Sequence, residues 1–381
     1  MKTKRTVRTF AAASFFNDIG SDIIAPLWPV FLKETLGAPF KVIGILDGFK
    51  ESITSISQVF SGYLSDRLKK RKIFIWAGYL CGALSRVGYS ISSHWGMLFP
   101  AIFLDRAGKM RDAPRDAMVA DISTRQNRAR NFGIIEAWDN AGAVLGILLS
   151  IWLITFLDLK TIFLIAAIPT LISVLLVILF IQDTRDGNVF KDLAWKNLGR
   201  NFNLFTLSNI FFTLGFFSYS FLILYLKDQQ FPLTSLPVFY LIFSLSASIF
   251  SGLSGKFADR FSRRLTLIIS FTLWAVVTVA FIAMPALSWV SAGILFALYG
   301  MHKGALKPAQ SAFVSESAPA EQRASILGFF KMITGLCALP ASFIAGVLWD
   351  AYGPLAPFSF ALAMTLLALF TMLMVQEPKE G

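Results

Sequence analysis

Two apolar runs limit what this chain can fold into more than any other feature. Residues 162–181 and 357–375 contain no charged side chain. Because an α-helix rises about 1.5 Å per residue, each run can cross roughly 30 Å of hydrocarbon. Only 15% of all residues are charged and 55% are hydrophobic, whereas soluble domains contain about 25% charged residues. The sequence therefore predicts an all-α polytopic membrane protein rather than a soluble domain.

Apolar segments of this kind recur along the whole chain. We predict twelve transmembrane helices, at approximately 8–32, 41–64, 72–92, 95–116, 132–155, 160–181, 204–227, 233–256, 265–284, 288–310, 325–348 and 356–375. The links between them alternate between rich and poor in Lys and Arg. Because cytoplasmic loops carry the excess of these residues, both termini are expected in the cytoplasm, with the protein in the plasma (inner) membrane. The excess of Lys and Arg in cytoplasmic loops also explains the net charge of +12. We therefore expect no nucleic-acid partner.

The chain also divides into two halves. The polar stretch 182–203 is the expected cytoplasmic linker between an N-terminal six-helix bundle at 1–181 and a C-terminal six-helix bundle at 204–381. Short sequences recur between the halves at nearly constant spacing. GYLSDRLKKR (62–71) returns as GKFADRFSRR (255–264), RARNFG returns as RASILG, and Lys109 and Pro114 return as Lys303 and Pro308. Parallel repeats of this kind place a solute site between the halves, near the midplane of the membrane.

The repeated G-x-L-x-D-R-x-x-R/K-R motif resembles the loop signature of the major facilitator superfamily. Lys69 and Ser262 stand where that signature usually has Gly. With twelve spans and two repeats, the resemblance covers the whole chain. It implies the fold of that superfamily and a secondary transporter that opens alternately to either side of the membrane. The stretch at 105–117 follows a DRxGKxRxxPRDA pattern, which resembles one in a subset of bacterial members and fixes no substrate.

Ionisable residues inside the predicted spans are the best candidates for function. Each costs at least about 2.5–3.5 kcal/mol at the membrane centre, so it usually faces a polar path. Asp18 and Asp22 lie one helical turn apart, as do Asp47 and Glu51, and Arg86 is expected to neutralise one of these acids. The predicted substrate and coupling path contains Asp18, Asp22, Asp47, Glu51, Asp105, Arg106, Lys109, Asp139, His302, Lys303 and Lys331.

The fourth span carries the densest charge. As one continuous helix, it would place Asp105, Lys109, Asp112 and Asp116 on one stripe, with Arg106 about a quarter turn away. This spacing predicts that the Lys109 ammonium reaches the carboxylates of Asp105 and Asp112. In the fifth span, Gly142 and Gly146 form a G-x-x-x-G pattern that predicts close helix packing.

A second set of charges lies nearer the cytoplasmic ends of the spans. The resemblance implies that Asp66 and Asp259 pair with a helix N-terminus and help to close the cytoplasmic side, which the helix dipole favours. The basic run at 69–72 is interpreted as a topology determinant. The predicted cytoplasmic gate contains Asp66, Arg67, Asp112, Arg115, Asp116, Arg128, Glu136, Asp259, Arg260 and Arg323.

Three roles for these charges stay open, and they do not exclude one another. The acids of the first two spans suit proton or cation coupling. The bases Arg106, Lys109, Lys303 and Lys331 suit an anionic solute. Near the interface, Asp112, Arg115, Asp116 and Glu136 suit internal bridges or gates.

The first hypothesis is a proton-coupled secondary transporter for a small polar, anionic or zwitterionic solute. Its rivals are an efflux transporter for amphipathic compounds and a non-transporting membrane sensor. We expect no enzyme, because no nucleophile–base constellation appears. We also expect no ATP-binding loop, no metal site and no cofactor, and a monomer in the lipid bilayer.

Overall fold

The computed structural model describes residues 2–68, 70–124, 128–182, 199–284, 286–317 and 323–377, and all regular structure in this part is helical. The chain forms two compact units. The first contains Met1–Gly37 and Ile53–Lys191, and the second contains Ala38–Ser52 and Asp192–Gly381. The helix α3 (Phe40–Leu68) therefore contributes its first part to the second unit and its remainder to the first.

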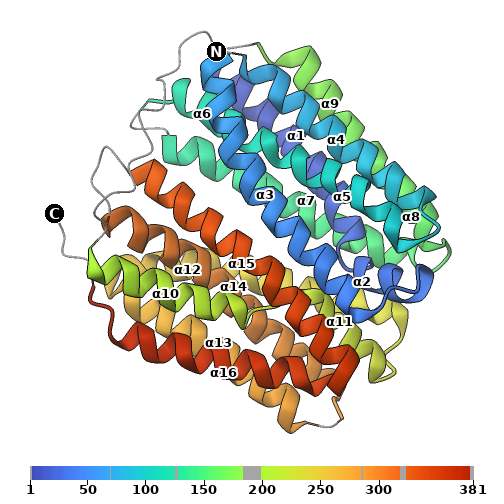
Figure 1. The fold of residues 1–381 in the computed structure, drawn as a ribbon. Coiled ribbons are helices and arrows are strands. Elements are labelled where there is room, and N and C mark those ends of the chain that lie inside the picture. The colour runs from blue at the N-terminus through green and yellow to red at the C-terminus, as the bar shows by residue number, and fades with distance from the viewer. Residues whose placement is uncertain are drawn as a thin grey trace. The chain divides into compact units, whose positions relative to one another are not determined.

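The first unit is built from helices that correspond to the predicted N-terminal spans (Figure 1). They are α1 (Lys2–Ile24), α2 (Trp28–Val30), the π-helical turn η1 (Phe31–Thr35), α4 (Arg71–Ile91), the 3-10 turn η2 (Trp95–Met97), α5 (Leu98–Ala107), the 3-10 turn η3 (Gly108–Arg111), α6 (Asp112–Asp121), α7 (Arg128–Leu153), α8 (Leu159–Ile165) and α9 (Ala167–Phe180). Helix α1 packs against α7 and α9, and α4 packs against α5 and α9.

The second unit contains the first part of α3 and the helices of the C-terminal half. These are α10 (Arg200–Leu214), α11 (Tyr219–Asp228), the 3-10 turn η4 (Leu233–Ser235), α12 (Leu236–Arg260), α13 (Arg263–Ala283), α14 (Trp289–Ser317), α15 (Arg323–Tyr352) and α16 (Leu355–Leu373). Helix α14 packs against α12 and α13, and α16 packs against α10 and α13.

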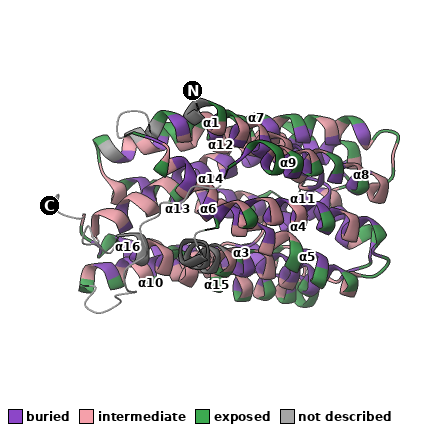
Figure 2. Ribbon diagram, turned by 90° about the horizontal axis from the view of Figure 1, so that it is seen from above, coloured by how far each residue is buried: buried purple, intermediate pink, exposed green. Residues whose placement is uncertain are grey.

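Many helices carry buried residues on one face and exposed residues on the other, as Figure 2 shows, and many of the exposed side chains are large and apolar. On α9, Val177 is fully buried, whereas Leu175 and Leu179 are 56% and 68% exposed. Large apolar side chains on an outer surface suit contact with lipid, where a helix satisfies its own backbone hydrogen bonds. By length and apolar composition, seven helices of the described part can cross a membrane. The other predicted spans carry more charge or divide into shorter helices.

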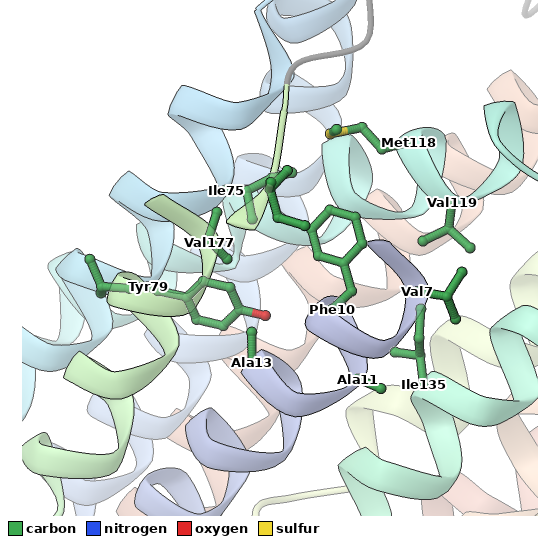
Figure 3. Close-up of a cluster of buried hydrophobic side chains, with 12 residues drawn as sticks. Val7, Phe10, Ala11, Ala13, Ile75, Tyr79, Met118, Val119, Ile135 and Val177 are labelled. Atoms are coloured by element: carbon green, nitrogen blue, oxygen red, sulfur yellow. The ribbon is translucent and has the colours of Figure 1, made fainter. Parts of the chain in front are cut away.

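The buried core of the first unit lies where α1, α4, α6, α7 and α9 meet (Figure 3). Phe10 of α1, Tyr79 of α4 and Val177 of α9 are fully buried within it. The Tyr79 hydroxyl lies 3.4 Å from Ser14 Oγ, so its polar end is satisfied inside an apolar cluster. This core fixes the position of α1, which carries Asp18 and Asp22.

In the second unit, α3 and α15 approach closely over several turns. A Cβ atom on Gly44 would lie 2.0 Å from the Ser342 carbonyl oxygen, and one on Gly48 would lie 2.5 Å from Leu339 Cα. Further along, Ser52 Oγ donates a hydrogen bond to the Gly335 carbonyl at 3.1 Å. Small residues permit this backbone contact, as is usual between membrane helices.

Candidate functional site

Arg86 of α4 lies at the centre of the charged group in the first unit. Its guanidinium is buried and donates to the carbonyls of Asn17 and Ala166, each at 3.2 Å, and to Ser21 Oγ at 2.9 Å. All three of these hydrogen-bond partners are uncharged oxygens, so the positive charge of Arg86 is still available to a neighbouring anion. Asn17 directly precedes Asp18 on α1, and Ser21 directly precedes Asp22. The positive charge of Arg86 therefore lies beside both acids.

The acids of α1 are only partly neutralised. Asp18 Oδ1 accepts a hydrogen bond from Asn17 Nδ2 at 2.8 Å. Asp22 interacts electrostatically with Asp18, Lys109 and Arg86. The structure thus groups Asp18, Asp22 and Lys109, three residues of the predicted path, around Arg86. Sequence reasoning gave Arg86 only a neutralising role, although a buried arginine in a span is itself a signal of function.

The charged fourth span is not one continuous α-helix. Helix α5 ends at Ala107, the 3-10 turn η3 follows, and α6 begins at Asp112. A 3-10 turn rotates successive side chains by more than the 100° of an α-helix, so the predicted stripe is wrong. Arg106 Nη2 instead pairs with Asp105 Oδ2 at 2.6 Å, and Lys109 interacts electrostatically with Asp112 and Asp18.

Arg111 stabilises this break. Its buried guanidinium lies 4.7 Å from the centroid of the Tyr79 ring and donates to the Gly108 carbonyl at 2.9 Å. Gly78 and Gly108 allow the two backbones to touch, because a Cβ atom on Gly78 would lie 2.5 Å from the Gly108 carbonyl oxygen. The turn η3 is therefore held against α4 by a cation–π contact and by close glycine packing.

Arg115 of α6 contacts side chains of α1 and α7 in the first unit. Its Nη1 donates to Ser14 Oγ at 2.9 Å and lies 4.0 Å from Asp139 Oδ2, and its Nε donates to Asp116 Oδ1 at 3.0 Å. Ser14 also contacts Tyr79. Asp139, predicted for the path, and Arg115 and Asp116, predicted for the gate, thus form one network.

The predicted glycine pattern of α7 is confirmed. A Cβ atom on Gly142 would lie 2.3 Å from the Phe15 carbonyl oxygen, and one on Gly146 would lie 2.5 Å from the Ile19 carbonyl oxygen. This packing fixes α7 against the part of α1 that carries Asp18 and Asp22. Glu136, which precedes this contact on α7, is exposed.

The basic residues at the end of the repeated motif, together with Lys72, have specific partners in both units. Arg71 pairs with Asp121, and Arg263 Nη2 pairs with Glu316 Oε1 at 2.5 Å. Lys72 Nζ donates to the Ile178 carbonyl at 2.8 Å, and Arg264 donates to the carbonyls of Met372 and Leu373. Arg71 and Lys72 therefore join the start of α4 to the ends of α6 and α9. Arg263 and Arg264 join the start of α13 to the ends of α14 and α16 in the same way.

These contacts correct the interpretation of Arg71 and Lys72 as topology determinants only, because both cap specific groups. Arg260 lies over the Phe261 ring at 5.6 Å and is exposed. The side chains of Asp66, Arg67, Arg128, Asp259 and Arg323, all predicted for the gate, lie outside the described residues.

The second unit holds the remaining members of the predicted path. Asp47 is buried and pairs with Lys50 at 3.4 Å. Glu51 interacts electrostatically with Lys303 of α14, so the structure groups two path residues that are distant in sequence. His302 Nδ1 lies 2.8 Å from the Ser270 carbonyl. Because a carbonyl only accepts, Nδ1 carries the proton in the neutral ring.

Lys331 differs from these, since it lies on an exposed part of α15. Among the residues that the structure describes, no group of three or more His, Cys, Asp or Glu side chains could hold a metal ion. The side chains grouped at these sites are carboxylates, guanidinium groups and ammonium groups, which support proton exchange and ion pairing.

Comparisons with known proteins point to one family. The chain matches the model described as Major Facilitator Superfamily over residues 10–336 and again over 205–381. It is 33% identical over 359 residues to an uncharacterized MFS-type transporter of Methanocaldococcus jannaschii, covering 91% of this chain and 88% of the relative. It is also 27% identical over 139 residues to the multidrug resistance protein MdtH of Cronobacter sakazakii, covering 36% of this chain and 34% of that protein.

Solved structures show the same fold. A point mutant of the nucleoside transporter NupG superposes with a TM-score of 0.81 at 14% identity, covering 97% of this chain and 99% of that one. A POT family transporter in complex with 5-aminolevulinic acid superposes with a TM-score of 0.81 at 12% identity, covering 97% and 95%. At these identities the likeness concerns the fold alone, and the predicted fold class is confirmed.

Proposed function

The chain belongs to the major facilitator superfamily and is a secondary transporter, not an enzyme, and from this premise we propose that it moves a small polar, anionic or zwitterionic solute coupled to protons. One observation carries the proposal. In the first unit, the buried cation Arg86 makes its hydrogen bonds to uncharged oxygens beside Asp18 and Asp22.

The arrangement supports coupling because its charges can be balanced in two ways. With all acids of this group ionised, Asp18, Asp22, Asp105 and Asp112 balance the bases Arg86, Arg106, Lys109 and Arg111. When Asp22 takes up a proton, one positive charge is left over, and an anionic group of the solute can neutralise it. Binding of a proton and binding of an anion then favour each other, as coupled transport requires.

The test uses the purified protein in liposomes that contain a pH-sensitive dye. We expect proton flux that depends on added solute, measured over a panel of amino acids, monocarboxylates and dicarboxylates. Asp22→Asn should abolish the coupled proton flux while solute exchange persists. Asp158→Asn is the matched control, because Asp158 caps α8 by accepting hydrogen bonds from the backbone amides of Lys160 and Thr161. Proton flux that is unchanged in Asp22→Asn would refute the role of Asp22.

A second candidate function is efflux of amphipathic compounds. It is favoured by the partial similarity to the multidrug resistance protein MdtH, although the chain spans only about a third of that relative. The test compares ethidium accumulation in cells with and without the expressed protein. Lower accumulation that does not depend on Asp22 or Arg86 would favour efflux over the first proposal.

We propose that both termini lie in the cytoplasm, that the membrane is the plasma (inner) membrane and that the protein is a monomer. The alternation of basic links supports the orientation. Reporter fusions at each terminus test it, and light scattering of the purified protein in detergent tests the monomer. We also propose, from the sequence and the family resemblance, that five further residues act in the cytoplasmic gate: Asp66, Arg67, Arg128, Asp259 and Arg323.

A further inference from the structure

One span of the second unit is interrupted in its middle. Helix α10 ends at Leu214 and α11 begins at Tyr219, so residues 215–218 are not helical. Trp274 Nε1 donates to the Gly215 carbonyl at 3.1 Å, which satisfies one freed backbone group. Irregular backbone at membrane depth is tolerated only inside protein or beside a polar path, and broken helices mark solute sites in many transporters.

The interruption presents Phe216 to a lysine. Lys303 Nζ of α14 lies 4.4 Å from the centroid of the Phe216 ring. Within the described residues, no ion pair is formed by Lys303, and Glu51 acts on it only through longer-range electrostatics. Lys303 and Phe216 are both partly exposed. An ammonium that faces a ring rather than a carboxylate keeps its positive charge available to an anion.

Further aromatic rings continue from Phe216. Its ring lies nearly parallel to that of Tyr299, with centroids 6.0 Å apart and an interplanar angle of 19°. Tyr299 stacks in turn on Phe243, with centroids 4.7 Å apart at 28°, and Tyr240 lies beside Phe243 at 5.4 Å. Phe243 and Tyr240 are partly exposed. Offset stacking is a favoured geometry for aromatic pairs, so a flat ring can be added to this stack.

We propose that Lys303 and these rings form a subsite for an anionic solute that carries a flat unsaturated ring. Lys303 takes the acidic group, the ring packs on Phe216 beside it, and Phe243 supports Phe216 through Tyr299. This inference rests on the proposed function, because it names the class of solute that the transporter moves. Glu51 competes with the solute for Lys303, so removal of its charge should tighten binding.

The test measures equilibrium binding to the purified full-length protein by isothermal titration calorimetry. Benzoate and cyclohexanecarboxylate are the probes, because they match in charge and ring size and only benzoate is flat. We expect benzoate to bind roughly threefold to tenfold more tightly, which is the scale of one aromatic pair. Glu51→Gln should strengthen binding of both probes.

Two variants separate the acidic group from the ring. Phe216→Leu should remove the preference for benzoate and leave cyclohexanecarboxylate binding nearly unchanged, and Phe243→Leu is the second test if Phe216→Leu fails to fold. Lys303→Gln should weaken both probes. The control is Phe370→Leu, a change of the same chemistry at a side chain of α16 that is 59% exposed.

The subsite would be refuted if the unaltered protein bound benzoate and cyclohexanecarboxylate equally tightly, or if it bound neither. So would benzoate binding that is unaffected by Lys303→Gln. Failure here is distinguishable from failure of the proposed function, because the proton-flux assay with Asp22→Asn does not depend on these rings. Proton flux that responds only to non-aromatic solutes would support the function and refute this inference.

Discussion

The carboxylate of Asp350, near the end of α15, accepts a hydrogen bond from the backbone amide of Phe40 at 3.1 Å, and so caps a helix that begins 310 residues earlier. Its other oxygen accepts from the amide of Lys41 at 2.9 Å. The first amides of a helix have no partner within that helix. The Phe40 ring also stacks on Trp349, with centroids 4.4 Å apart. The start of α3 is thus fixed to the end of α15 by a polar and an aromatic contact.

Asp350→Ala should loosen this junction. We expect a loss of about 0.5–2 kcal/mol in stability, the usual effect of removing a helix cap, and faster hydrogen exchange of the amides of residues 40–43. Mass spectrometry of exchanged peptides measures it. Asp158→Ala is the control, since it removes the cap of α8 and should leave the exchange of α3 unaltered. Unchanged exchange at the start of α3 in Asp350→Ala would show that the cap is dispensable.

Gly44→Ala should disrupt the packing of α3 on α15. The added methyl group would lie 2.0 Å from the Ser342 carbonyl oxygen, so one helix must move, at a cost of about 1–3 kcal/mol. Gly252→Ala on α12 is the matched control, because no atom lies within 4 Å of its added Cβ, and alanine favours helix by about 1 kcal/mol. In thermal unfolding in detergent, the midpoint temperature should fall for Gly44→Ala and rise for Gly252→Ala. Equal midpoints for the two variants would contradict the close contact.

The ion pair between Arg263 and Glu316 should contribute measurably, since the two side chains are only 16% and 30% exposed. A double-mutant cycle with Arg263→Gln and Glu316→Gln should give a coupling energy of about 1 kcal/mol, at the upper end for partly exposed pairs. The equivalent cycle for Arg71 and Asp121 should give a coupling of the same sign. If the stability changes of the single variants add up in both cycles, the ion pairs contribute no stability, and Arg71 and Arg263 would act only as topology determinants.

Arg86→Lys should impair transport although it keeps the charge. The guanidinium of Arg86 donates to three oxygens from two helices, and a lysine ammonium cannot reproduce this planar geometry. We expect a loss of about 1.5–3 kcal/mol in stability and slower solute exchange in liposomes. Arg5→Gln, at an exposed position of α1, should behave like the unaltered protein. Full exchange by Arg86→Lys would reduce Arg86 to a simple counter-charge.

The sequence could predict the fold because apolar length and the alternation of basic links are local properties of the chain. It could also predict a close-packing face at Gly142 and Gly146, since small residues at four-residue spacing share one helix face, whereas the partner α1 comes from the structure alone. The rise per residue of a helix predicts similar depths for Asp18, Asp22 and Lys109. It does not predict that Asp22 and Lys109 interact with each other, because that depends on how α1 packs against the fourth span.

Other features depended on geometry that no local pattern encodes. The pairing of Arg106 with Asp105 joins adjacent residues of α5, and the helical pattern does not predict it because neighbouring side chains on a helix point in different directions. The predicted stripe fails for another reason, since a 3-10 turn replaces the α-helix from Gly108 onward. Asp350 stands in a segment that reads as an ordinary helix end, and its partner is hundreds of residues away. The depth of Lys303 could be predicted, whereas the ring that it faces depends on the interruption of the span after Leu214.

The division of α3 between the two units has a mechanical consequence. Residues 40–52 are held by α15 through glycine contacts, Ser52 and Asp350, while the remainder of the same helix belongs to the first unit. This first part of α3 is therefore fixed to the second unit. If the first unit rotates during transport, α3 must either bend near residue 52 or lose its contacts with α15 one turn after another. The strength of the contacts between α3 and α15 would then set how readily the transporter turns over, and Asp47 and Glu51 of the predicted path lie within that stretch.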